Sequence, residues 1–323
     1  MSSIRADGTL GSVLGAIGNT PVVELSRLTN GLPGRLVVKL DYLQPGFSKK
    51  DRVALRMIED AEASGELRPG QPVVELTSGN AGTGFSIVCA IKGYHFVAVM
   101  SRGNSEERAR MMRALGAEVV LVDQLPESTP GKVSGADLDL VEAEAQRIVR
   151  ERGAFRPDQF RLQSNYRAHR DTTGPELVAQ TGGVIDAFCD MAGSGGTVGG
   201  TSAALKQAIP GVKCFVVEPV GAAVLAGKPI VNADHRIQGA GYSRAELANI
   251  PSEAVDGFLT IDDEAATEMT RRLAREEGIF AGFSSGANVS AAMELLQGKF
   301  QGGTVATIIN DSGLKYLSTD LWD

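Results

Sequence analysis

Apolar residues along this chain gather in short unbroken runs that alternate with segments of helical spacing. Unbroken runs of this length are typical of strands that are buried on both faces. They cover residues 36–40, 73–76, 96–100, 118–122, 187–193, 214–219 and 304–310. Helices are predicted over residues 50–64, 105–116, 136–152 and 262–278. Two more follow the glycine-rich turns at residues 77–82 and 193–197, and another begins at about residue 286. This alternation predicts an α/β fold with mostly parallel sheets flanked by helices.

Composition narrows the class of protein. The 323 residues are 43% hydrophobic and 22% charged, which is ordinary for a globular chain long enough to form two lobes. A net charge of −7 argues against a nucleic-acid partner. No apolar run approaches the roughly 18 residues of a membrane-spanning helix, and the N-terminus lacks a signal pattern. We therefore expect a cytoplasmic protein that does not contact a membrane.

Cysteines and histidines indicate neither a disulfide framework nor a metal site. Cys89, Cys189 and Cys214 each lie inside an apolar run, and an odd number of cysteines with no close pair favours small buried side chains. The three histidines are far apart and show no ligand spacing. We expect no metal ion.

The turn GSGGT, residues 193–197, lies between a predicted strand and a predicted helix. Its glycines let backbone N–H groups converge at the N-terminus of the helix, which makes a cradle for a phosphate. The glycine spacing differs from both the Walker and the dinucleotide patterns. A tight turn that binds no ligand explains the residues equally well.

The turn TSGNAG, residues 77–82, occupies a similar place after another strand. Thr77, Ser78 and Asn80 offer hydroxyl and amide groups where two glycines free the backbone. This cluster suits a carboxylate, or a ring oxygen that needs a donor. Simple helix capping by Ser78 or Asn80 is the alternative explanation.

The stretch PGFSKKDR, residues 45–52, places two lysines at the start of a predicted helix. An amine becomes a nucleophile when it loses its charge through desolvation. A cation in the first turn of a helix is disfavoured by the helix dipole, which helps to lower the pKa of Lys50. A phosphate cradle, an activated lysine and a carboxylate clamp together indicate pyridoxal phosphate acting on an amino acid.

Ten motifs in this chain resemble, in the same order, those of the cysteine synthase family (O-acetylserine sulfhydrylase, with cystathionine β-synthase as a near relative). The similarity covers nearly the whole chain. The motifs are IGNTPVVEL (17–25), PGFSKKDR (45–52), TSGNAG (77–82), RARMMRALGAEVVL (108–121), TTGPEL (172–177), GSGGTVGG (193–200), VVEP (216–219), IQGAGY (237–242), GIFAGFSSGAN (278–288) and SGLKYLSTDL (312–321).

The resemblance implies a two-lobed fold-type II pyridoxal 5'-phosphate enzyme, similar to the tryptophan synthase β chain. We expect residues 36–154 to form a smaller lobe that carries the substrate-carboxylate loop. Residues 1–35 and 155–323 would form a larger lobe that carries the phosphate-binding loop, with the cofactor in the cleft between the lobes. A polar loop over residues 123–135 also indicates a lobe boundary.

The resemblance also assigns roles to single residues. Lys50, which precedes x-Arg in the family pattern, carries the cofactor as a Schiff base, whereas Lys49 falls at a variable position and is expected to be exposed. Asn80 binds the 3-oxygen of the ring, and Ser284 faces the ring nitrogen. The phosphate is held by Gly193, Ser194, Gly195, Gly196 and Thr197. The substrate is bound by Thr77, Ser78, Gly79, Ala81, Gln163 and Gly239.

A hydroxyl at the ring nitrogen bears on the type of reaction. Because Ser284 cannot keep that nitrogen protonated as a carboxylate would, the resemblance favours loss of a β-leaving group over racemisation or transamination. The expected reaction is β-replacement on an activated L-serine through an aminoacrylate, with Lys50 also acting as the base. Sulfide as the nucleophile, which would make the protein a cysteine synthase in amino-acid biosynthesis, is the first interpretation.

Several departures from the family pattern leave the substrates open. Ala81 stands where relatives usually have threonine, so one hydroxyl donor to the substrate carboxylate is missing. Tyr242 and Arg244 would reshape the entrance, and Arg244 would suit a phosphorylated serine. The alternatives are another nucleophile in a diaminopropionate-type or cystathionine synthase reaction, a cysteine-degrading lyase, and a non-catalytic homologue that binds a partner. The resemblance further implies a homodimer whose active site can accept a partner enzyme's C-terminal tail.

Overall fold

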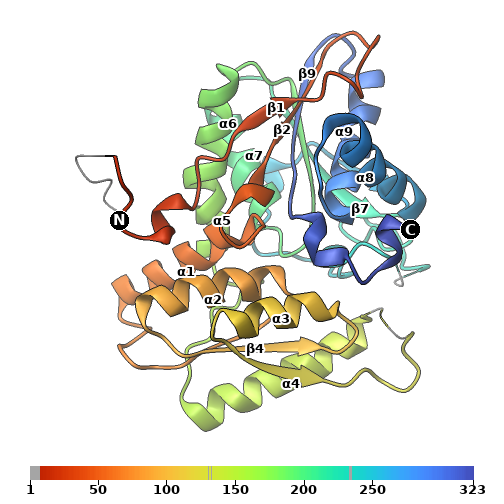
Figure 1. Cartoon of the computed structure of the whole chain (residues 1–323). Coiled ribbons are helices and arrows are strands. Elements are labelled where there is room, and N and C mark those ends of the chain that lie inside the picture. The colour runs from red at the N-terminus through yellow and green to blue at the C-terminus, as the bar shows by residue number, and fades with distance from the viewer. Residues whose placement is uncertain (1–7, 130, 132, 233–234) are drawn as a thin grey trace.

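A six-stranded sheet forms the centre of the larger lobe, with strand order β1-β2-β9-β6-β7-β8. Its strands are β1 (Val22–Glu24), β2 (Arg35–Lys39), β6 (Ala187–Met191), β7 (Lys213–Pro219), β8 (Gly257–Ile261) and β9 (Thr304–Ile308). Only β1, which pairs with β2, is antiparallel to its neighbour. This computed structural model describes residues 8–129, 131, 133–232 and 235–323, and Figure 1 shows them as two lobes.

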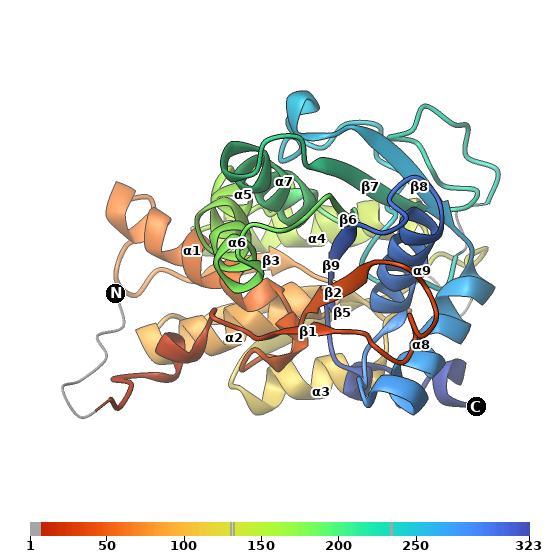
Figure 2. The same cartoon turned by 90° about the horizontal axis from the view of Figure 1, so that it is seen from above.

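Helices cover both faces of the larger sheet because its strands carry apolar residues on both sides. In β2, Leu36 and Val38 belong to one core and Val37 belongs to the other. The helices α8 (Asp263–Glu277) and α9 (Phe283–Gln297) pack on the first face, and α6 (Gly174–Thr181) and α7 (Gly196–Ala208) on the second, as Figure 2 shows from above. This layering confirms the predicted α/β class.

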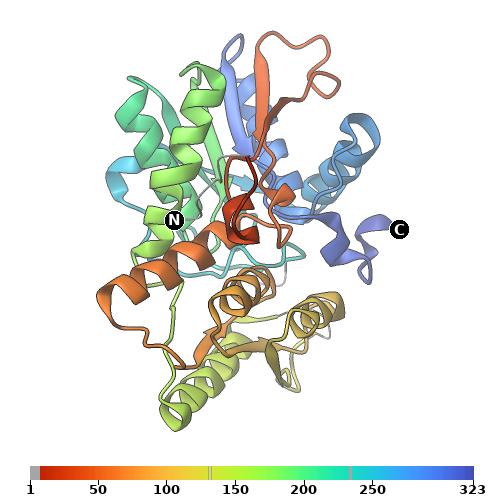
Figure 3. The ribbon, with the colours of Figure 1, turned by 60° about the vertical axis from the view of Figure 1, so that its left-hand side comes forward.

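The smaller lobe has a three-stranded parallel sheet between two layers of helices. Its strands are β3 (Val73–Leu76), β4 (Phe96–Ser101) and β5 (Glu118–Val122). The helices α1 (Lys50–Ser64), α2 (Asn80–Lys92) and α3 (Glu106–Ala114) pack on one face, and α4 (Gly135–Arg152) packs on the other. Figures 1 and 3 show α1 and α2 on the side of this lobe that faces the larger lobe.

The lobe boundaries predicted at residues 36 and 154 differ from those in the structure, and the polar loop at 123–135 does not separate the lobes. The smaller lobe cannot begin at residue 36, because Arg35–Lys39 is a strand of the larger sheet and pairs with β9. It does not end at residue 154 either, since Phe155 forms a bridge with Val73 at the edge of the smaller sheet. The loop at 123–135 lies inside the smaller lobe, because α4 after it packs on the same sheet as β5 before it. Residues 1–7 and 130 and 132 lie outside the described residues.

The elements that the apolar pattern missed lack long buried runs. Strand β8 lies at the edge of the larger sheet, and Phe258 in it is an exposed side chain. The helices α5 (Ser164–Ala168) and α6 are only five and eight residues long. None of the described helices has the length and apolar character needed to span a membrane.

A buried ion-pair network holds α1 against the larger lobe. Arg52, in the first turns of α1, donates to the Asp41 carboxylate at 2.9 Å and to the Glu176 carboxylate at 2.6 Å. Lys39, from β2, donates to Glu176 at 2.7 Å. Arg52, Asp41 and Lys39 have almost no exposed surface. The network therefore fixes the helix that begins with Lys50 to the sheet of the opposite lobe.

Replacing Arg52 with leucine would leave the buried Asp41 carboxylate without its cation. Breaking one partner of a buried ion pair costs about 3–5 kcal/mol, so we expect the free energy of unfolding to fall by about that amount in urea titrations. Arg110→Leu is the matched control, because the pair of Arg110 with Glu106 is exposed and such pairs contribute about 0–1 kcal/mol. Equal small losses in both variants would contradict this role of the network.

Candidate active site

Lys50 points from the N-terminus of α1 toward the larger lobe. Its Nζ donates to Ser194 Oγ at 3.0 Å, in the glycine-rich turn that precedes α7. Burial lowers the pKa of Lys50 from 10.5 to about 7, and the positive charge of Lys49 acts in the same direction. A large fraction of the amine is therefore uncharged near neutral pH, which is the form that acts as a nucleophile.

The turn at residues 193–197 is shaped so that its backbone can approach a ligand. Gly195 has φ +83°, a conformation that favours glycine, and it is the N-cap of the 13-residue helix α7. A Cβ on Gly193 would lie 2.7 Å from the Gly239 carbonyl, and one on Gly196 would clash with the Asn165 side chain. The N–H groups at this helix terminus, helped by the helix dipole, suit a phosphate.

Two buried side chains support the turn from behind. Asn165 Nδ2 donates to Ser194 Oγ at 2.8 Å, and His169 Nε2 lies 3.2 Å from Thr197 Oγ1. Burial holds the pKa of His169 well below its usual range, so the ring is neutral. The hydroxyls of the turn are thus fixed in place without an added positive charge from His169.

The loop of residues 77–82 is organised around the Thr77 hydroxyl. Thr77 Oγ1 accepts hydrogen bonds from the N–H groups of Gly79 at 2.9 Å and Gly82 at 2.8 Å. The N–H of Thr83 binds the Gly79 carbonyl. The first N–H groups of a helix have no partner within it, so those of Asn80 and Ala81 in α2 remain for a carboxylate.

Gly79 brings this loop against a buried arginine. Its φ is +125°, and a Cβ there would lie 2.5 Å from Arg108 Cδ. Arg108 in turn donates to the Ser78 carbonyl at 2.7 Å. Arg108 therefore holds the loop through the Ser78 carbonyl and leaves no room for a side chain at Gly79.

Asn80 is held at both ends of its side-chain amide by the C-terminal segment. Its Nδ2 donates to Asp311 Oδ2 at 2.8 Å, and its Oδ1 accepts from Lys315 Nζ at 2.8 Å. Lys315 is fully buried and also donates to the Gly46 carbonyl at 2.8 Å. The amide keeps a second N–H for a ligand. Asp311 therefore lies next to the residue predicted to bind the ring.

Ser284 lies in the first turn of α9 and is almost fully buried. Its Oγ accepts a hydrogen bond from Asn310 Nδ2 at 3.1 Å. The hydroxyl can still donate its own proton to an acceptor in the pocket.

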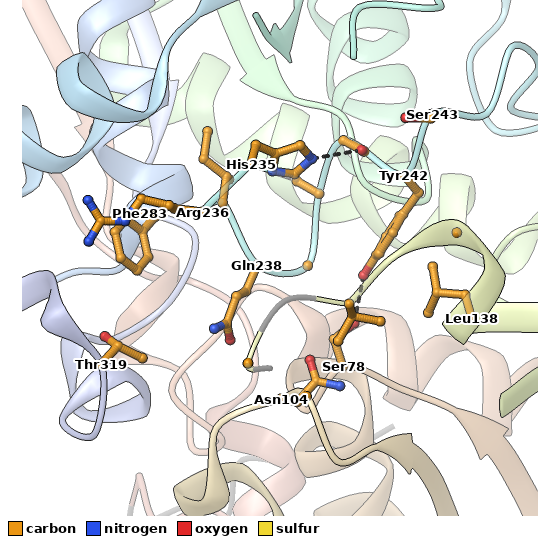
Figure 4. A pocket seen from close by; sticks show the side chains of 18 of the residues that line it. Ser78, Asn104, Leu138, His235, Arg236, Gln238, Tyr242, Ser243, Phe283 and Thr319 are labelled. Atoms are coloured by element: carbon orange, nitrogen blue, oxygen red, sulfur yellow. Dashed lines mark hydrogen bonds between the residues drawn. The ribbon is translucent and has the colours of Figure 1, made fainter. Parts of the chain in front are cut away.

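One pocket between the lobes collects most of the predicted site residues. Its walls include Lys50, Asn80, Gly193, Ser194, Gly195, Thr197, Gly239 and Ser284. A second cavity of about 310 Å³ lies beside it, and both are lined by Gln238, Gly239 and Ala240. Figure 4 shows this second cavity, in which Ser78 of the smaller lobe and Tyr242 of the larger lobe point toward one another. Their hydroxyl oxygens are 2.8 Å apart.

Other predicted residues lie away from the pocket walls. Gln163 is exposed and donates to the Ala248 carbonyl at 2.9 Å, so the structure does not bring it to the cleft. The Ala81 side chain packs in the core of the smaller lobe. Arg244 is exposed, and its guanidinium lies 4.3 Å from the centre of the Phe160 ring, outside the cavity of Figure 4.

The expectation that Lys49 is exposed is wrong. Its side chain is buried, and its Nζ forms an ion pair with Asp190 at 2.8 Å. The sequence carried no signal for this pair, because the partners are 141 residues apart. Asn165 and Lys315 were missed for the same reason. No cluster of three or more potential metal ligands occurs within the part of the chain that the structure describes.

Comparisons with known proteins agree with this geometry. Residues 13–311 match the family described as pyridoxal-phosphate dependent enzyme. Cysteine synthase of Staphylococcus aureus is 41% identical over 310 residues, which is 95% of each chain. The structure of O-acetyl serine sulfhydrylase isoform 3 from Entamoeba histolytica matches 100% of this chain and 94% of its own, with 33% identity and a TM-score of 0.88. The structure of O-acetylserine dependent cystathionine β-synthase from Helicobacter pylori matches 98% of this chain and 99% of its own, with 29% identity and a TM-score of 0.88.

The chain therefore belongs to the pyridoxal-phosphate dependent enzymes and, within them, to the cysteine synthase family. Its own pocket fits that cofactor. The turn at 193–197 leaves no room for Cβ atoms at Gly193 and Gly196, and it presents N–H groups suited to the phosphate. The Lys50 amine, with a pKa near 7, is suited to a covalent bond with the aldehyde.

Replacing Thr77 with valine tests the organisation of the carboxylate loop. The change keeps the side-chain shape but leaves two N–H groups without an acceptor, and each buried loss costs about 1–3 kcal/mol. We expect the KM for the amino-acid substrate to rise about tenfold or more, while a spectroscopic titration shows little change in cofactor affinity. Thr77→Ser keeps the acceptor and should retain the native KM. An unchanged KM in the valine variant would contradict the assignment.

Proposed function

We propose that this protein catalyses β-replacement on an activated L-serine, with sulfide as the incoming nucleophile and L-cysteine as the product. The observation that carries the proposal is the half-buried Lys50 amine, placed 3.0 Å from Ser194 Oγ in a glycine-rich turn at a helix N-terminus. The relatives named cysteine synthase and O-acetyl serine sulfhydrylase support the same reaction. Pyridoxal phosphate, when bound, supplies an electron sink for the bonds at the substrate's α-carbon.

Lys50 and the loop at 77–82 have separate tasks in this proposal. The N–H groups of Asn80 and Ala81, with the Ser78 hydroxyl, bind the substrate carboxylate. Lys50 Nζ then accepts the α-proton while the leaving group departs from the β-carbon with its bonding electrons. Sulfide adds to the β-carbon, and Lys50 returns the proton to the α-carbon. Protons and electrons therefore balance without an external oxidant or reductant.

Ser284 favours this outcome over other reactions of amino acids. We propose that it faces the ring nitrogen, where a hydroxyl stabilises a proton less well than a carboxylate does. Asp190 is a carboxylate in the same pocket, but its two oxygens already accept hydrogen bonds from Lys49 and Asn288. The weaker electron sink that results favours departure of a β-leaving group over transamination.

The cavity of Figure 4 favours one second candidate, a β-replacement with a larger nucleophile. Its volume of about 310 Å³ exceeds what sulfide needs, and polar side chains of Asn104, Gln238 and Thr319 line it. The Helicobacter pylori relative is named for cystathionine synthesis from O-acetylserine. Homocysteine is therefore the competing acceptor.

We further propose a cytoplasmic homodimer whose cleft can accept the C-terminal tail of a partner enzyme, as the family resemblance implied. The second cavity, which Ser78 lines, supports this proposal because it offers room for such a tail beside the site. Light scattering of the full chain tests the dimer, and a monomer at micromolar concentration would contradict it.

The product of the reaction decides between these functions. Purified enzyme with bound cofactor is given O-acetyl-L-serine with sulfide, homocysteine or ammonia, and the products are identified by mass spectrometry. We expect L-cysteine from sulfide with a kcat/KM at least about tenfold above that for the other acceptors. Preferential formation of cystathionine would establish the second candidate. Cofactor binding without turnover of this donor with any acceptor would overturn the proposed β-replacement.

A further inference from the structure

Lys49, the neighbour of the attachment lysine, is a buried charge. It is the N-cap residue of α1 and is 8% exposed. Its Nζ donates to both oxygens of the Asp190 carboxylate, at 3.0 and 2.8 Å. An ordinary lysine at the start of a helix extends into water, so this bidentate contact requires an explanation.

Asp190 is fixed in the middle of the larger lobe. It lies in β6 with no exposed surface, and its Oδ1 also accepts a hydrogen bond from Asn288 Nδ2 at 2.8 Å. Asn288, in α9, donates as well to the Ile308 carbonyl of β9 at 2.9 Å. Three elements of the larger lobe therefore hold a carboxylate that needs a cation.

Both members of the pair line the same pocket as Lys50. Glu75 of β3 and His169, which follows α5, also act electrostatically in this region. Burial lowers the pKa of His169 well below its usual range and raises that of Glu75 to about 8, and Glu75 is also paired with Arg156 at 3.3 Å, so neither group adds a large net charge near Lys50 at neutral pH. Lys49 and Asp190 are therefore the charges that matter most to the Lys50 amine among these four groups.

We propose that Lys49 occupies Asp190 so that the neighbouring Lys50 amine stays uncharged and free to bond to the cofactor. Lys49 is a positioning residue in this account, since it acts through Lys50 and Asp190. The inference rests on Lys50 being the attachment lysine, as the family resemblance implies. The positive charge of Lys49 opposes protonation of Lys50, while its contact with Asp190 neutralises the group that would favour protonation.

Removal of Lys49 alone would reverse this arrangement. Asp190 would remain as a buried carboxylate with Lys50 in the same pocket, and an unpaired buried charge is strongly unfavourable. Lys50 would then hold its proton to higher pH. Removal of both charges would have a smaller effect in the same direction, because the effect of Lys49 on Lys50 exceeds the opposite effect of Asp190.

Four variants of the full-length chain separate this role from a structural one. Lys49→Met removes the cation, Lys49→Met with Asp190→Asn removes both charges, and Lys49→Arg keeps the pair. Lys206→Met is the control, since Lys206 is another lysine in an ion pair, with Asp256, and neither residue lines the pocket of Lys50. Thermal unfolding of each variant reports the structural cost of the change.

The direct readout is the pH dependence of Lys50 reactivity in the cofactor-free chain. Trace acetic anhydride is added across a pH series, and fragmentation mass spectrometry distinguishes acetylation at position 50 from that at position 49. We expect a native midpoint near 7, and a rise of about one pH unit or more in Lys49→Met. The doubly changed protein should lie between these two, and Lys49→Arg and Lys206→Met should match the native protein.

A second readout uses the cofactor itself. The rate at which each chain rebinds pyridoxal phosphate, followed by its visible absorbance, should shift to higher pH in the order seen for acetylation. A native midpoint in Lys49→Met would overturn the proposal. If Lys49→Met does not fold, the doubly changed protein decides. A Lys50 midpoint in that protein at or below the native midpoint would overturn the proposal. The midpoints are independent of product formation, so failure of the proposed β-replacement would leave this inference standing.

Discussion

The approach of one half-buried amine to one glycine-rich turn is the contact on which this structure depends. Lys50 belongs to the smaller lobe and Ser194 to the larger, and their side chains meet at 3.0 Å across the cleft. The amine must be shielded from water to lose its charge, and the turn must have glycines at positions 193 and 196, where a Cβ would clash, for its backbone to approach a phosphate. Neither lobe provides both features, so the site exists only because the lobes are held in this arrangement.

Buried polar contacts maintain that arrangement from three directions. Arg52 ties α1 to the larger lobe below Lys50, and Lys315 from the C-terminal segment binds Asn80 on the smaller lobe. Asn165 supports the turn at residues 193–197. Buried charges cost free energy unless they are paired, so their concentration around this cleft indicates that they serve the geometry of the site. In the role proposed above, the Lys49–Asp190 pair controls the charge of the Lys50 amine, whereas the other pairs control its position.

The sequence predicted the local features of the site but not the contacts between distant segments. Glycines and hydroxyl residues beside a strand reveal a turn, and the start of an apolar helical face reveals where Lys50 lies. Nothing local to Lys49 indicated Asp190, because charge pairing between two lobes depends on how the sheets come together. Gln163 shows the converse, since the family resemblance assigned it to the substrate and the structure places it outside the cleft. The boundary at residue 36 was misplaced because the chain forms a strand of the larger sheet before it enters the smaller lobe.

The covalent position of the cofactor tests the central claim most directly. The purified enzyme is treated with borohydride, which fixes pyridoxal phosphate to its lysine, and the modified peptide is sequenced by mass spectrometry. The account predicts a pyridoxyl group on Lys50 and none on Lys49, whose amine is bound to Asp190. A pyridoxyl group on Lys49, or an enzyme that binds the cofactor without modification of either lysine, would contradict the account.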